Sequence, residues 1–198
     1  MRDTSNIQDL LELDLDYMGF IFFEKSARNA EGIVSEDILQ AFPSTTKKVG
    51  VFVNASKEFI LAQHAKYNFQ ALQLHGSESP EFCASFPDLE IIKAFGVDDG
   101  FDFKKLEPYK DLVDYFLFDT KTPLHGGSGL VFNWQKLKEY DQSKPFFLSG
   151  GLSADNIKEV LQYQDMNIHA VDVNSKFELE PGLKNIKLLK DSVFKELR

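Results

Sequence analysis

The sequence is poor in cysteine and in long apolar stretches. Its 198 residues include one cysteine, Cys83, which cannot form a disulfide within the chain and so favours a reducing compartment. No apolar run approaches the roughly 20 residues that a membrane-spanning helix needs. The first ten residues, MRDTSNIQDL, are polar and acidic, unlike a secretory signal peptide. We therefore expect a cytoplasmic protein with no membrane partner.

Clustered positive charge is also missing. The formal net charge is −9 and the sequence pI is about 4.9, with no long run of lysine and arginine. This balance argues against nucleic acid and against an anionic membrane surface as partners. An anionic substrate would need local donors, because the overall field repels it. The length and the 43% hydrophobic content predict a single domain over residues 1–198 with a full core.

Short apolar segments recur along the whole chain and predict buried strands. Each is nearly continuous in hydrophobicity, as strands covered on both faces are. The seven segments are 17–23, 49–53, 71–76, 90–97, 115–120, 145–151 and 169–175. Because helical patterns fill the intervals between them, we expect a parallel sheet, either open or closed into a barrel.

The helical patterns carry recognisable start signals. Ser79 is a candidate N-cap with Pro80 at the first helical position, and Ser153 is a candidate N-cap for the segment that follows it. A further helix is expected over 56–68, and the spacing of apolar residues predicts another over 181–197.

Polar and glycine residues follow many of the predicted strands. They are Glu24 to Arg28, His75 and Gly76, Asp119, Ser149 to Gly151, and Asn174 and Ser175. An open sheet would concentrate such residues at one switch point, whereas a (β/α)8 barrel draws its site from many strand ends. The sequence therefore favours an α/β fold of the TIM-barrel type.

The segment 117–134, LFDTKTPLHGGSGLVFNW, stands out as a long loop that begins at the end of a strand. Loops of this length inside a compact domain tend to be functional or disordered. Asp119 ends the apolar run, where desolvation can raise the pKa of a carboxyl group. The alternative is that Asp119 only caps the loop or pairs with Lys121.

Six motifs give the chain a specific resemblance. They are GFIFFEKSAR, VGVFVN, LQLHGSESP, FDTKTPLHGGSG, LSGGLSADNI and VDVNSKFELEPGLKN, in this order between residues 18 and 185. In this combination the chain resembles the phosphoribosylanthranilate isomerases, barrel enzymes of tryptophan and hence aromatic amino-acid biosynthesis. The resemblance implies an Amadori rearrangement of N-(5-phosphoribosyl)anthranilate to 1-(2-carboxyphenylamino)-1-deoxyribulose 5-phosphate. A general acid and a general base suffice for this rearrangement, so we expect no metal and no cofactor.

The same resemblance assigns roles to individual residues. It makes Asp119 the general acid and Arg28 the partner of the anthranilate carboxylate, a task suited to a guanidinium. Gln73, His75 and Asp172 are expected to line the substrate site. Backbone donors for the phosphate are expected at Gly127, Ser128, Gly129, Gly150, Gly151, Asn174 and Ser175. The alternatives are a solvated arginine, a structural histidine and glycines that only form tight turns.

The resemblance also implies a first strand that ends in a lysine, an aliphatic residue, a cysteine and a glycine, with the cysteine as general base. Met1 matches the position after that glycine, and Cys83 lies in a predicted helix. We therefore expect the chain as printed to lack the first strand and the base, through a misassigned start or a true truncation, and to be inactive. The alternative function is a barrel that binds phosphorylated ligands without catalysis. A monomer and a homodimer are both compatible with the sequence.

Overall fold

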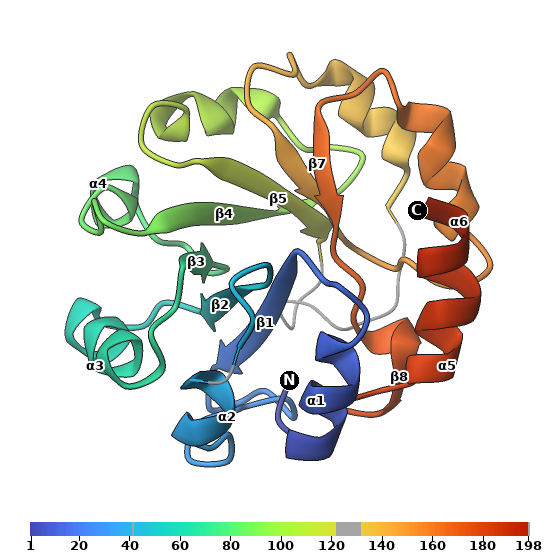
Figure 1. Ribbon diagram of the computed structural model, residues 1–198. Coiled ribbons are helices and arrows are strands. Elements are labelled where there is room, and N and C mark those ends of the chain that lie inside the picture. The colour runs from blue at the N-terminus through green and yellow to red at the C-terminus, as the bar shows by residue number, and fades with distance from the viewer. Residues whose placement is uncertain (41, 122–131, 198) are drawn as a thin grey trace.

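The structure, a computed structural model, describes residues 1–40, 42–121 and 132–197. Its centre is one sheet of parallel strands in sequence order, which curls around a common interior (Figure 1). The strands are β1 Tyr17–Phe22, β2 Lys47–Phe52, β3 Ala71–Leu74, β4 Glu90–Val97, β5 Tyr115–Thr120, β6 Phe146–Leu148 and β7 Ile168–Val171. The seven predicted strands are confirmed, and the α/β fold has the curvature of a TIM barrel.

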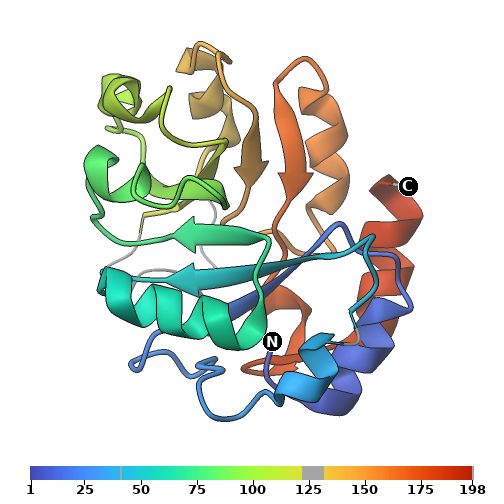
Figure 2. The same ribbon diagram turned by 60° about the vertical axis from the view of Figure 1, so that its left-hand side comes forward.

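Short helices surround the outer face of the sheet (Figure 2). The α-helices are α1 Thr4–Leu11, α2 Glu36–Gln40, α3 Lys57–Tyr67, α4 Pro80–Cys83, α5 Ile186–Leu189 and α6 Lys195–Leu197. The 3₁₀ helices are η1 Phe103–Tyr109, η2 Trp134–Glu139, η3 Ile157–Tyr163 and η4 Ser175–Phe177, and η5 Lys190–Phe194 is a π-helical segment. Among the described residues, no helix is long and apolar enough to cross a membrane.

The helix starts agree with the sequence in one case and differ in another. Ser79 caps α4 by accepting from the Phe82 N–H, with Pro80 at the first position, as predicted. The predicted cap at Ser153 is wrong, because η3 begins at residue 157 after Asn156. Residues 154–156 form a turn before η3, in which Asn156 Oδ1 accepts from the Ser153 N–H.

The predicted C-terminal helix is shorter than the pattern suggested. Residues 178–184 form a two-stranded hairpin of β8 Glu178–Glu180 and β9 Leu183–Lys184. Gly182 has a φ of +88° in its turn, a conformation that a helix cannot contain. The helical segment then starts after Asn185, whose side chain accepts from the Leu188 N–H.

In strands β2 to β6 residues on both faces of the sheet are buried, whereas β1 buries one face only and β7 has no buried residue. On β1, Met18 and Phe20 pack outward into the core beneath the helices. Val51, Leu117 and Phe147 belong to a second cluster inside the curled sheet. Burial on both faces explains why β2 to β6 read as continuous apolar segments.

β1 and β7 stand at the two ends of the sheet, and no strand ladder joins them within the described residues. Tyr17 Oη lies 3.0 Å from His169 Nε2 across this seam, and the backbone nitrogen of Met1 donates to the Gly19 oxygen at 2.7 Å on the β1 edge. The missing first strand itself stays a prediction.

Candidate functional site

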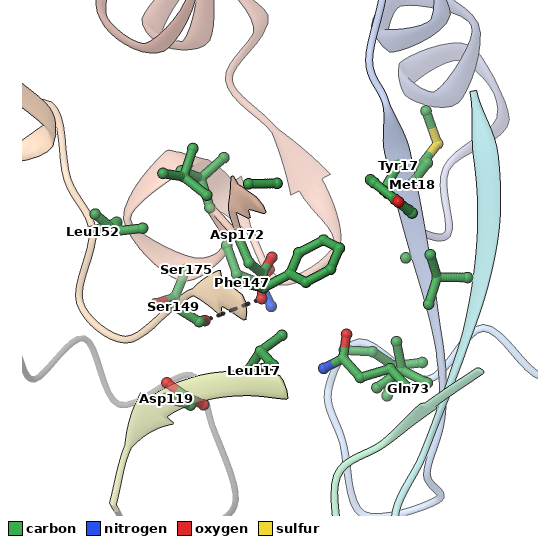
Figure 3. Close-up of a pocket in the computed structure, with 18 of the residues that line it drawn as sticks. Tyr17, Met18, Gln73, Leu117, Asp119, Phe147, Ser149, Leu152, Asp172 and Ser175 are labelled. Carbon is green, nitrogen blue, oxygen red and sulfur yellow. Dashed lines mark hydrogen bonds between the residues drawn. The ribbon is translucent and has the colours of Figure 1, made fainter. Parts of the chain in front are cut away.

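A cavity of about 1170 Å³ lies inside the curled sheet and reaches the seam between β1 and β7. Figure 3 shows side chains from well-separated strands around it: Gln73 on one side, and Asp119, Ser149 and Asp172 on the other. Its lower wall is apolar, with residues such as Ile21, Leu117 and Phe147, while the polar groups gather where the strands end. This division matches the usual geometry of sites in parallel barrels.

Asp119 is the penultimate residue of β5 and is buried, with 8% of its surface exposed. One carboxylate oxygen, Oδ1, accepts from the Thr120 N–H at 2.8 Å. The other, Oδ2, lies 3.4 Å from His75 Nε2. The carboxyl group is thus oriented by two partners while it lines the cavity.

His75 is held in turn by Gln73, which also lines the cavity. Gln73 Nε2 lies 2.8 Å from His75 Nδ1. Because an amide nitrogen can only donate, Nδ1 is the acceptor in this arrangement, which leaves the imidazole proton on Nε2 facing Asp119. The three side chains, each expected from the sequence to belong to the site, therefore form one connected chain of contacts.

A buried ion pair that the sequence reasoning missed fixes the loop carrying His75. Lys93 and Glu78 have side chains that are each 2% exposed, and Lys93 Nζ lies 3.0 Å from Glu78 Oε2. Lys93 also donates to the Gly76 oxygen at 2.7 Å, and Glu78 accepts from the N–H groups of Gly76 and Asn54. The signal in the sequence was a lysine inside the apolar strand EIIKAFGV, since a buried charge requires a partner.

Asp172 follows β7 and lines the same cavity. Its carboxylate accepts from Ser149 Oγ at 3.0 Å, as Figure 3 shows. Burial raises the pKa of Asp172 above its ordinary value, and the nearby charge of Asp119 raises it further. Asp172 therefore retains a proton to a higher pH than a solvated aspartate does.

Arg28 lines the cavity, but its guanidinium is already engaged. It donates to Glu178 on the β8–β9 hairpin, with Nη2 at 2.7 Å from Oε2. Lys184 Nζ lies 3.0 Å from the same carboxylate. Glu178 and Lys184 both lie within the motif VDVNSKFELEPGLKN, from which no site role was predicted for either residue.

The glycines expected at the phosphate site have the backbone freedom that close approach requires. Gly150 and Gly151 have φ values of +85° and +69°. A Cβ on Gly150 would lie 2.5 Å from the Thr120 nitrogen, so no larger residue fits there. Asn174 and Ser175 also line the cavity. The other expected phosphate residues, Gly127, Ser128 and Gly129, lie outside the described residues.

The thiol of Cys83 lies apart from these groups. It ends α4, is fully buried and is not one of the residues that line the cavity. Burial raises its pKa to about 11, so the thiol stays protonated at neutral pH. In the described part of the chain, no group of three or more histidine, cysteine and acidic side chains could hold a metal ion.

Comparisons with known proteins agree on one family. The family model described as N-(5'phosphoribosyl)anthranilate (PRA) isomerase matches residues 1–195. A relative of that name from Parabacteroides distasonis is 41% identical over 98% of this chain and 89% of its own length. Another from Phocaeicola vulgatus is 39% identical over 93% of this chain and 89% of its own.

Solved structures give the same result. The crystal structure of phosphoribosyl anthranilate isomerase from Thermotoga maritima has a TM-score of 0.82 at 32% identity and covers 96% of this chain and 92% of its own. The enzyme from Thermus thermophilus has a TM-score of 0.84 at 25% identity over 100% and 94% of the two chains. A third structure is a complex with reduced 1-(o-carboxyphenylamino)-1-deoxyribulose 5-phosphate, with a TM-score of 0.79 at 28% identity over 96% and 91%.

Proposed function

We propose that this chain catalyses the Amadori rearrangement of N-(5'-phosphoribosyl)anthranilate, because it belongs to the N-(5'-phosphoribosyl)anthranilate isomerase family. It is thus an isomerase of tryptophan biosynthesis. The observation that carries the proposal is the meeting of Asp119, His75, Asp172 and Arg28 at one cavity. These groups come from different strand ends, as a barrel enzyme's site requires.

The first half of the reaction needs an acid, and we assign it to Asp119. Its carboxylic proton goes to the furanose ring oxygen as the bond from that oxygen to C1 breaks. The lone pair of the anilino nitrogen then forms the C1–N double bond of a Schiff base. Asp119 is buried at the end of a strand and lines the cavity, so its carboxyl group lies where a bound sugar would be within reach.

The second half needs a base on the opposite side of the sugar. Removal of the C2 proton sends its electron pair into a C1–C2 double bond and neutralises the nitrogen. The resulting enolamine becomes the ketone by tautomerisation. We propose that this base is a cysteine on a strand that fills the seam between β1 and β7, as the resemblance implies; both edges of the seam border the cavity.

Substrate binding divides among the remaining groups. Arg28 takes the anthranilate carboxylate through charge-assisted hydrogen bonds. The backbone at Gly150, Gly151, Asn174 and Ser175 takes the phosphate, which the acidic chain would otherwise repel. Gln73, His75 and Asp172 line the space between, with Asp172 near the anilino nitrogen.

We infer that the ligand is a phosphorylated small molecule, because one solved relative is a complex with reduced 1-(o-carboxyphenylamino)-1-deoxyribulose 5-phosphate. A Thermotoga maritima relative is described as dimeric, which is compatible with a homodimer here. The comparisons do not support the expectation that the chain as printed is inactive, because a relative named as the isomerase matches 98% of it. They also give no support to a barrel that binds phosphorylated ligands without catalysis.

Turnover of purified protein tests the proposal. Phosphoribosylanthranilate is supplied to the chain as printed and to a chain extended by an N-terminal segment ending in Lys-Val-Cys-Gly. Conversion by the extended chain, lost when the added cysteine is changed to serine, is the expected result. No conversion by either form would refute the proposed function. Equal conversion by both forms would refute only the assignment of the base.

A further inference from the structure

The guanidinium of Arg28 is held on one edge by a single carboxylate. Its Nε donates to Glu178 Oε2 at 2.9 Å and to Oε1 at 3.1 Å, and its Nη2 donates to Oε2 at 2.7 Å. Glu178 has a side chain that is only 4% exposed, against 17% for Arg28. Within the described part of the chain, Nη1 makes no hydrogen bond. The ion pair therefore occupies one side of the planar fork and leaves the other side to a ligand.

Glu178 is bound by more than Arg28. Its Oε1 also accepts from Lys184 Nζ at 3.0 Å and from the Gly182 N–H at 3.2 Å. Burial alone would raise the pKa of Glu178, but the hydrogen bond from Arg28 and the charge of Lys184 outweigh it, and the pKa lies below its ordinary value. The carboxylate thus stays ionised with its position fixed from three directions.

Lys184 ties this cluster to the rest of the cavity wall. Its Nζ donates to Asn174 Oδ1 at 2.6 Å. Its backbone is clamped by the buried side chain of Asn6, which accepts from the Lys184 N–H at 2.7 Å and donates to its oxygen at 2.9 Å. The cluster is therefore anchored to α1, the β8–β9 hairpin and the loop after β7.

All three charged residues line the cavity. Among these three groups two cations share one anion, which leaves an excess of one positive charge, and Asp172 is a further acidic group near Lys184. That excess matches one carboxylate, whereas an unpaired arginine and lysine together would carry two and would repel each other. A cluster that served the fold alone would not need to face the cavity or leave one guanidinium edge without a protein partner.

We propose that Glu178 is a positioning residue that orients Arg28 towards the substrate carboxylate, with Lys184 balancing its charge, so that the cluster selects substrates that carry this carboxylate. The inference rests on the proposed function, since it deepens the role given there to Arg28. It makes the β8–β9 hairpin a determinant of specificity.

Binding of two ligands tests the inference apart from catalysis. The first is reduced 1-(o-carboxyphenylamino)-1-deoxyribulose 5-phosphate, and the second is the same compound without the carboxylate. Isothermal titration calorimetry gives the ratio of their affinities for wild type and for Glu178→Gln. The ratio should fall about 10-fold or more in the variant, the scale of one charge-assisted contact, while the affinity for the carboxylate-free compound stays the same.

The matched control is Glu180→Gln, which removes an exposed carboxylate from the same strand and should keep the wild-type ratio. Should Glu178→Gln bind neither compound, the same affinity ratio is measured for Glu178→Asp. The shorter side chain of aspartate keeps the negative charge but lies farther from Arg28. The affinity ratio should therefore again fall. An unchanged or increased ratio in a variant that still binds the carboxylate-free compound would overturn the inference. Failure of wild type to bind either compound would instead overturn the proposed function.

Discussion

His75 Nε2 lies 3.4 Å from Asp119 Oδ2, although His75 directly follows β3 and Asp119 belongs to β5, and β4 separates these strands in the sheet. Curvature of the sheet brings their side chains together over its interior. Gln73 sets the imidazole proton on the nitrogen that faces the carboxyl group. Gln73 thus orients His75, and His75 in turn orients the carboxyl group of Asp119.

This contact predicts a catalytic effect of His75→Ala. Loss of one oriented contact to a carboxyl group should lower kcat roughly 10-fold, a cost of about 1.5 kcal/mol, while KM changes little. Steady-state kinetics would measure it. His64→Ala, on the outer helix α3, should leave kcat unchanged. If both variants behave alike, the His75 contact has no part in turnover.

Gly150 and Gly32 both have a positive φ. A comparison of their alanine variants separates the cost of backbone strain from the cost of steric crowding. Gly150→Ala and Gly32→Ala both place a side chain at positive φ, which costs roughly 1–2 kcal/mol. Only at Gly150 does the added Cβ also meet the backbone of Thr120, whereas nothing lies within 4 Å at Gly32. Urea unfolding should therefore show the larger loss of stability for Gly150→Ala. Equal losses would mean that the close approach to Thr120 is unimportant.

The raised pKa of Asp172 predicts a pH-dependent effect on stability. The folded state holds this proton to a higher pH than the unfolded state, so the native protein is penalised as pH rises through the unfolded-state value of 3.8 towards the folded one. Asp172→Asn removes the penalty. The free energy of unfolding of the variant, relative to wild type, should increase as the pH rises above about 4 and level off once Asp172 of the folded wild type has ionised. A relative stability that is constant or falls over this range would contradict the assignment.

The buried thiol of Cys83 should be inert and dispensable for turnover. With its pKa raised to about 11 by burial, it should react with a thiol reagent only after unfolding. Cys83→Ala should cost about 1 kcal/mol of stability through the small cavity it leaves, with kcat within a few-fold of wild type. A folded Cys83→Ala protein without activity would make Cys83 the base.

Strands β2 to β6 were predictable because each is buried on both faces and reads as an uninterrupted apolar segment. Asp119 and His75 were candidates because polar residues at strand ends drew attention to them, whereas Gln73 was expected from the family resemblance alone. The Arg28–Glu178 pair was not, because its members are 150 positions apart and only the folded hairpin brings them together. The turn after Ser153 was missed because a serine ahead of a helical pattern is typical both of an N-cap and of a turn.

The proton donor is the centre of the proposed mechanism, and one substitution tests it most directly. In the form of the chain that converts phosphoribosylanthranilate, Asp119→Asn should lower kcat by about 10²–10⁴-fold without unfolding the protein. The control is Asp98→Asn, which removes a carboxylate paired with Lys121 at the protein surface and should leave kcat near that of wild type. A kcat for Asp119→Asn within a few-fold of wild type would contradict the account.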